Sequence, residues 1–169
     1  MSGGRADAGG VAVLGAGSWG TALAVQLCRN GHRASLWGHE PEHMEELARD
    51  RENRRFLPGF PLPSGLEPTA SLDRALSNAQ ACLVAVPSHA FAEVLSRLPG
   101  RLSAHLGVAW ATKGLDPASG GLLHATARQV LPDESLAVVS GPSFAREVAR
   151  GLPTAVTVAS EDASFASRI

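Results

Sequence analysis

A glycine motif near the start of the chain constrains its fold more than any other feature. Val11 to Leu14 is a short apolar run that leads directly into Gly15-Ala16-Gly17-Ser18-Trp19-Gly20, and an alanine-rich helical pattern follows. A G-x-G-x-x-G pattern by itself recurs by chance, but its place between a strand and a helix is typical of a dinucleotide-binding turn. A glycine-rich turn without any ligand is the alternative interpretation.

Each glycine of the motif has a distinct physical role in such a turn. We expect Gly15 to permit the tight turn after the strand, Gly17 to let the backbone approach a pyrophosphate, and Gly20 to let the helix pack closely on the sheet. The pyrophosphate then lies at the helix N-terminus, where free N–H groups and the helix dipole favour an anion. The motif therefore predicts a dinucleotide site.

Composition excludes several classes of protein. The 169 residues fit one domain, with 44% hydrophobic residues, 18% charged residues and a formal net charge of -1, so neither a nucleic-acid partner nor a disordered acidic tail is expected. The apolar runs Ala81 to Val86 and Val108 to Ala111 are too short to span a bilayer, so no membrane insertion is expected. The sequence of Met1 to Gly10 is typical of a flexible leader and not of a signal peptide, so we expect a cytoplasmic protein. We expect residues 11–169 to form the dinucleotide-binding domain.

The cysteines and the histidine pair favour no metal centre. Cys28 and Cys82 each lie among apolar neighbours, which indicates buried thiols. His39 and His43 are four residues apart, a spacing that can hold a metal on a helix, but no third ligand completes a zinc site. We therefore expect no metal.

Strand-like and helix-like segments alternate along the chain. The expected strands are Val11 to Leu14, Ala34 to Trp37, Ala81 to Val86, Val108 to Ala111, Leu136 to Val139 and Thr154 to Ala159. The expected helices are Ser18 to Asn30 with Leu23, Leu27 and Cys28 on one face, Pro41 to Arg51, Ser71 to Ser77, Ser88 to Leu98, Leu122 to Leu131, and one ending near Arg150. Ser71 and Ser88 are expected to be the N-caps of their helices. Prolines and glycines between Phe56 and Pro68 predict an excursion that folds over a bound ligand.

This alternation predicts an α/β fold of the Rossmann type, a doubly wound, mostly parallel sheet with helices on both faces. Ligands of such sheets bind at the carboxyl ends of the strands. Five segments directly follow predicted strands and should meet at that edge: the glycine turn, Gly38-His39, Val86 to His89, Thr112-Lys113 and Ser140 to Ser143.

The cofactor preference depends on the end of the second strand. An acidic residue there binds the adenosine ribose of NAD, and its charge repels the 2′-phosphate of NADP. Here the strand ends Trp37-Gly38-His39, with no carboxylate before Glu40. Arg49, Arg51, Arg54 and Arg55 follow nearby, so NADP is favoured over NAD, although a solvated helix face explains these arginines equally well.

Five motifs in one order resemble a known family. Gly15 to Ala24, Trp37-Gly38-His39, Val86 to His89, Trp110 to Leu115 and Ser140 to Glu147 together look like the N-terminal half of bacterial-type NAD(P)-dependent glycerol-3-phosphate dehydrogenase. The resemblance runs from about Val11 to Ser160. That family interconverts sn-glycerol 3-phosphate and dihydroxyacetone phosphate and feeds glycerophospholipid synthesis.

The resemblance implies roles for particular residues. Gly15, Gly17, Ser18, Trp19 and Gly20 would contact the cofactor at the turn, and His39 would lie beside the adenosine ribose. Lys113 would touch both cofactor and substrate, which suits a cation between two phosphorylated ligands. Gly141 and Ser143 would hold the substrate, and Ala145 would meet the cofactor. His89 reads equally well as a cap or surface histidine, and Lys113 as a solvated lysine.

What the family has beyond these motifs matters as well. Its helical C-terminal domain supplies the lysine that acts as proton donor or acceptor, whereas Lys113 is the only lysine of this chain. We therefore expect no catalytic residue here, an inactive cofactor-binding fragment, and exposed apolar surface that favours a homodimer. Another dehydrogenase, of the 6-phosphogluconate or ketopantoate reductase type, and a stand-alone NAD(P)-sensing module are the competing hypotheses.

Overall fold

A single seven-stranded sheet organises the computed structural model, which describes residues 10–103 and 105–169. The strands are β1 Gly10–Leu14, β2 Ala34–Trp37, β3 Leu66–Thr69, β4 Ala79–Val84, β5 Gly107–Trp110, β6 Leu136–Ser140 and β7 Thr157–Ser160. The helices are α1 Ser18–Arg29, α2 Pro41–Asp50, α3 Leu72–Leu76, α4 Ser88–Ser96, α5 Leu123–Val130, α6 Ala145–Arg150 and α7 Ala163–Arg168. The expected leader lies outside the described residues except for Gly10, which begins β1.

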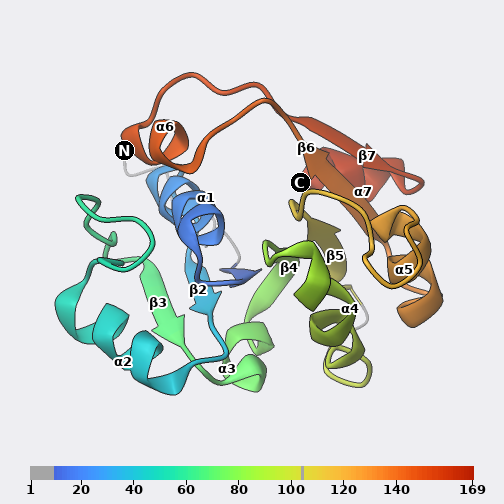
Figure 1. The fold of residues 1–169 in the computed structure, drawn as a ribbon, viewed down its shortest axis with the longest axis horizontal. Coiled ribbons are helices and arrows are strands. Elements are labelled where there is room, and N and C mark those ends of the chain that lie inside the picture. Colours follow the sequence, from blue (N-terminus) through green and yellow to red (C-terminus); the bar gives the residue numbers. More distant parts are fainter. Residues whose placement is uncertain (1–9, 104) are drawn as a thin grey trace, which may run out of the picture.

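The strand order is β3-β2-β1-β4-β5-β6-β7 (Figure 1). All neighbouring strands pair in parallel except β6 and β7, which are antiparallel. Because β2 and β4 flank β1, the direction in which the chain winds reverses at β1. In doubly wound sheets this switch point opens a crevice at the carboxyl ends of the strands. The predicted Rossmann-type fold is confirmed.

Helices cover both faces of the sheet, as Figure 1 shows. Alternate residues of β1 point to opposite faces, because side chains alternate along a strand. Leu14 packs in a core with side chains of α3, α4 and α5. Val13 packs in a second core with side chains of α1 and α2. Further along this second face, Phe165 of α7 packs against Leu83 and Ala109.

Two elements differ from the sequence prediction in kind. The end of the predicted excursion, Leu66–Thr69, forms the edge strand β3, where Pro68 is tolerated because an edge strand need not donate every N–H. Helix α7 was not predicted. It forms because Phe165 buries its ring against Gly107 of β5, where an added Cβ would stand 2.5 Å from that ring.

Other predictions were wrong in detail. The expected inner face of α1, Leu23, Leu27 and Cys28, is only half-buried, whereas Ala22, Ala24 and Val25 are fully buried. The reason is that α1 packs against both the sheet and α6, and alanines allow that close approach. Ser88 does not cap α4 but is its first residue, with Pro87 before it. Strand β4 begins and ends two residues earlier than predicted, and β7 begins three residues later.

None of the helices in the described part of the chain is both long enough and apolar enough to cross a membrane.

Candidate functional site

The glycine motif forms the tight link between β1 and α1. Gly15 has φ +124°, a conformation that side-chain-bearing residues rarely adopt, and an added Cβ would stand 2.6 Å from the carbonyl oxygen of Ala85. At Gly20, an added Cβ would collide with the carbonyl oxygen of Gly15. Both glycines are therefore required by the protein itself, one for the turn and one for the close packing of α1.

Gly17 differs from these two glycines. Its φ of -77° suits any residue, and an added Cβ would meet no protein atom within 4 Å. Gly17 is also the N-cap of α1, and no side chain within the described chain caps that end. The open space beside Gly17 and the uncapped N–H groups fit an anionic ligand that approaches the backbone closely.

A buried asparagine fixes the turn from behind. The Asn53 side chain is fully buried, and its Nδ2 donates to the Ala16 carbonyl oxygen at 2.9 Å and to the Thr21 Oγ1 at 2.8 Å. Its Oδ1 accepts from the backbone N–H of Phe56 at 3.1 Å and lies 3.2 Å from the His43 Nε2. Because both Asn53 donors are in use, the His43 Nε2 must be the donor in that last contact. Sequence reasoning missed Asn53, which stands in a run of charged residues.

Three adjoining cavities form one cleft along the carboxyl ends of the strands. The β1–β2 cavity, of about 440 Å³, and the central cavity, of about 370 Å³, share Gly17 and Ala85 to Pro87. The central cavity in turn shares Trp19 and Ala111 to Lys113 with the β5–β6 cavity, of about 460 Å³. The cleft therefore runs from the second strand, past the glycine turn, to the sixth.

The β1–β2 cavity contains the residues that follow β2. Gly15, Gly17 and His39 line it, and His39 is exposed. Glu40 lines it too, and its Oε2 accepts from the Arg55 Nη1 at 2.8 Å. This hydrogen bond from Arg55 lowers the pKa of the Glu40 carboxyl.

The arginines near this cavity are mostly engaged elsewhere. Arg49 and Arg54 pair with Asp50, and Arg51 donates to three backbone carbonyls. By contrast, Arg97 of the loop after α4 lines the cavity and lies 5.2 Å from the Trp37 ring centroid. Sequence reasoning missed Arg97, because its approach to β2 depends on the packing of α4.

The central cavity brings together the starts of α1 and α6 and the end of β5. Ser18, Trp19, Lys113, Ser143 and Ala145 line it. The Lys113 Nζ lies 5.4 Å from the Trp19 ring centroid and 3.4 Å from the Ser143 carbonyl oxygen. The sequence-predicted residues from three distant segments thus meet around one cation.

Several polar atoms of this cavity lack a partner in the described protein. The Trp19 Nε1, the Thr112 Oγ1 and the Ser143 Oγ are buried without any hydrogen bond. Buried polar groups are nearly always paired in native proteins, so three unpaired groups around one cavity indicate that a ligand completes them.

The β5–β6 cavity extends the cleft away from the glycine turn. Gly141 lines it together with Lys113, Leu122 and Val156. At Gly141 an added Cβ would stand 2.6 Å from the Ala155 carbonyl oxygen, so this glycine also has a packing reason. All predicted site residues except Gly20 line the cleft, and Gly20 supports it from within the turn.

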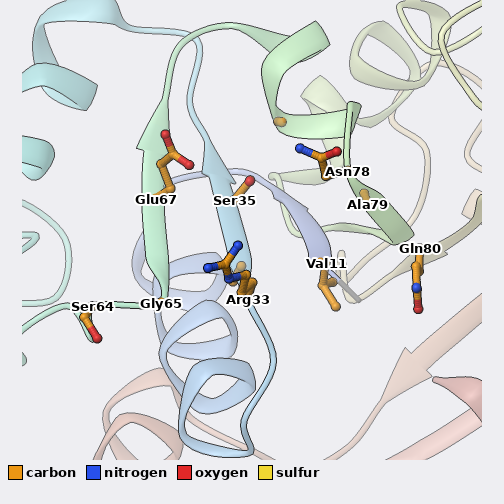
Figure 2. Close-up of a pocket in the computed structure, with 12 residues that line it drawn as sticks. Val11, Arg33, Ser35, Ser64, Gly65, Glu67, Asn78, Ala79 and Gln80 are labelled. Atoms are coloured by element: carbon orange, nitrogen blue, oxygen red, sulfur yellow. The ribbon is translucent and has the colours of Figure 1, made fainter. Parts of the chain in front are cut away.

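Another cavity, of about 750 Å³, lies at the amino ends of the strands, opposite the cleft. Figure 2 shows its lining, with Val11, Arg33 and Ala79 near the amino ends of β1, β2 and β4. Ligands of doubly wound sheets bind at the carboxyl ends, so this cavity is not the candidate site.

Neither cysteine lines the cleft. Burial raises the pKa of the Cys82 thiol to about 12, and the pKa of the half-buried Cys28 thiol is raised as well. Such thiols are unreactive at neutral pH. Among the residues that the structure describes, no cluster of three or more potential ligands could hold a metal ion.

Comparison with known proteins identifies the family. A family model described as NAD-dependent glycerol-3-phosphate dehydrogenase N-terminus matches residues 10–166. The chain belongs to this family. It is 54% identical over 156 residues to a glycerol-3-phosphate dehydrogenase (NAD(P)+) of Shewanella halifaxensis, which covers 92% of this chain and 46% of that protein. It is 53% identical over 162 residues to the enzyme of the same name from Aeromonas hydrophila, with 95% and 48% covered.

A solved structure of the family agrees with the fold. The crystal structure of glycerol-3-phosphate dehydrogenase from Coxiella burnetii superimposes with a TM-score of 0.90 and 42% identity, over 96% of this chain and 50% of that one. The chain spans about half the length of the curated dehydrogenases it matches.

Proposed function

We propose that this chain is the cofactor-binding half of an oxidoreductase that interconverts sn-glycerol 3-phosphate and dihydroxyacetone phosphate and feeds glycerophospholipid synthesis. The observation that carries the proposal is the continuous cleft, which joins the glycine turn to Lys113 and Ser143. Membership in the dehydrogenase family supports the reaction class.

The residues divide the work along the cleft. When bound, the nicotinamide cofactor supplies or accepts the hydride. The N–H groups at the start of α1 would bind its pyrophosphate beside Gly17 and Ser18, and Trp19 and Ala145 would hold its nicotinamide half. The Lys113 ammonium attracts phosphorylated ligands from both cavities, while Gly141 and Ser143 hold the substrate. None of these residues is the proton donor or acceptor, so we assign no catalytic residue to this chain.

Binding and turnover test separate parts of this proposal. Calorimetric titration of the 169-residue chain with NADH and NADPH should show saturable binding, and the absence of binding would refute the cofactor assignment. The chain alone should reduce dihydroxyacetone phosphate far more slowly than a full-length relative, because its single lysine, Lys113, is assigned to ligand binding and not to proton transfer. A comparable rate would show that the chain is complete as a catalyst.

We also propose that NADP is favoured over NAD. No carboxylate stands at the end of β2, and the carboxylate of Glu40 is neutralised by Arg55. Arg97 adds a cation to the same cavity. NADPH should therefore bind more tightly than NADH, with the difference shrinking as salt screens the 2′-phosphate. Equal affinities for the two cofactors would contradict this preference.

The cellular setting follows from the same assignment. We propose a cytoplasmic protein, since both cysteines are free thiols, as is usual in a reducing compartment. The partners proposed are the small phosphorylated substrate and a second copy of the chain, with neither nucleic acid nor membrane insertion involved.

A further inference from the structure

Thr112 belongs to the motif from Trp110 to Leu115, but its side chain has no assigned role. It follows β5 directly and lines both the central and the β5–β6 cavities. The residue is only 9% exposed, and its Oγ1 is buried with no hydrogen-bond partner in the described protein. A buried hydroxyl without a partner is unfavourable, so valine, which has the same shape, would serve the free protein at least as well.

The surroundings of Thr112 indicate what its hydroxyl binds. Gly17 and Ser18, at the proposed pyrophosphate position, line the same central cavity. A dinucleotide that starts there and continues through this cavity places its nicotinamide half next to Thr112. The Trp19 Nε1 and the Ser143 Oγ are unpartnered too, so three of the four unpartnered buried side-chain atoms in the described protein belong to residues that line this cavity.

The chemistry of the two groups is complementary. A threonine hydroxyl both donates and accepts a hydrogen bond, and the carboxamide and ribose hydroxyls of a nicotinamide nucleotide do the same. Threonine side chains move between staggered rotamers, so Oγ1 can turn toward either cavity that the residue lines. We propose that Thr112 is a positioning residue whose hydroxyl hydrogen-bonds the nicotinamide nucleotide half of the cofactor.

The test compares Thr112→Val and Thr112→Ser by calorimetric titration of the chain with NADH, NADPH and ADP. Thr112→Val should weaken both dinucleotides about three- to tenfold, the value of one net hydrogen bond. It should leave ADP binding unchanged, because ADP lacks the nicotinamide half. Thr112→Ser should keep most of the affinity.

A matched variant separates ligand binding from folding. Thr69 is also buried, but its Oγ1 accepts from the Ser71 N–H at 3.1 Å, and it lines none of the three cavities. Without ligand, Thr69→Val should lower the melting temperature and Thr112→Val should not. An equal loss of melting temperature would make Thr112 structural and overturn the proposal.

Binding results can overturn it in two further ways. Unchanged dinucleotide affinity in Thr112→Val, or an equal loss for NADH and ADP, would remove the specific contact. The inference rests on the proposed cofactor site, and the wild-type titrations test that site separately. If wild-type protein binds ADP and NADH, the site stands whatever Thr112 does; if it binds neither, both proposals fail.

Discussion

At Gly17, immediately before α1, an added Cβ would enter open space beside the cleft. At Gly20, three residues later, it would meet the carbonyl oxygen of Gly15. The two positions belong to one motif, yet a side chain is excluded by protein packing only at Gly20. The proposed ligand would account for Gly17, whereas the packing of the helix on the turn accounts for Gly20.

This difference predicts opposite phenotypes for the same substitution. Gly17→Ala should change the free energy of unfolding by less than about 1 kcal/mol, since alanine costs little at this backbone conformation. It should weaken NADH binding at least about tenfold, roughly 1.4 kcal/mol, because the methyl group occupies the pyrophosphate position. Gly20→Ala should cost about 1–3 kcal/mol or more through overpacking. Urea denaturation and titration calorimetry measure the two quantities, and wild-type NADH affinity in Gly17→Ala would contradict the assignment.

Asn53 supports the turn through a fully satisfied amide. Asn53→Ala would leave the Ala16 carbonyl, the Thr21 hydroxyl and the Phe56 N–H without their partner. Since each unsatisfied buried group costs about 1–3 kcal/mol, we expect a loss of more than about 2 kcal/mol in urea denaturation. Asn30→Ala, at an exposed asparagine, is the control and should stay within about 0.5 kcal/mol of wild type. Similar stabilities for the two variants would show that the Asn53 contacts are not formed.

At the scale of elements, sequence patterns predicted β1, α1 and β2 almost to the residue. Their apolar runs are bounded by glycines with defined roles, such as Gly15 and Gly31, whose φ of +93° follows the end of α1. The patterns failed where tertiary contacts decide. Phe165 is the only large apolar residue of α7, so no apolar periodicity in the sequence indicates that the helix packs against Gly107 of β5. The strand β3 was not predicted because it contains Pro68. Proline is found mainly in edge strands, and the sequence alone does not show that this segment is at the edge of the sheet.

The same distinction applies to the site. The residues carried by contiguous motifs, such as Ser18, Lys113 and Ser143, reach the cleft as expected. No role was predicted for the side chains of Asn53, Arg97 and Thr112, because those roles depend on which groups of distant segments face them. The sequence shows that Asn53 stands among arginines, but it does not show that the Asn53 amide hydrogen-bonds the glycine turn.

Helix α7 carries a prediction that depends on pH. The Asp162 carboxylate accepts from the Phe165 N–H at 3.0 Å and from the Ser135 hydroxyl at 2.7 Å. The hydrogen bond from Ser135 is the largest cause that lowers the pKa of Asp162, followed by the Phe165 N–H. Because the folded-state pKa lies below the unfolded one, the stabilisation is present above about pH 4 and is lost as pH falls through the folded-state pKa.

Asp162→Asn isolates this contribution, since asparagine keeps an N-cap acceptor without titrating. Thermal melting from pH 7 to pH 3 should show wild type losing stability relative to the variant only in the acidic part of the range. A constant difference between the two proteins across the whole range would exclude Asp162 as the titrating group.

At the scale of the whole molecule, several exposed large apolar side chains lie around the cleft. Phe144 is 72% exposed at the central cavity, and Leu122 is 68% exposed at the β5–β6 cavity, where Val156 also lies. Apolar groups gathered around a binding cleft are typical of surfaces that contact other protein segments. The mouth of the cleft is therefore the face through which this chain should associate.

We expect the chain to self-associate through this face as its concentration rises. Full burial of a side chain such as leucine or phenylalanine contributes about 1.5–3 kcal/mol, so covering Phe144 and Leu122 in both copies favours association and offsets part of its entropic cost. The double variant with Phe144→Ser and Leu122→Ser should sediment as a monomer at concentrations where wild type shows dimer in sedimentation velocity. Leu152→Ser is the matched control, because Leu152 is 49% exposed but lines none of the three cavities of the cleft. If the control dissociates the dimer as completely as the double variant, or wild type stays monomeric at all concentrations, association does not occur through the mouth of the cleft.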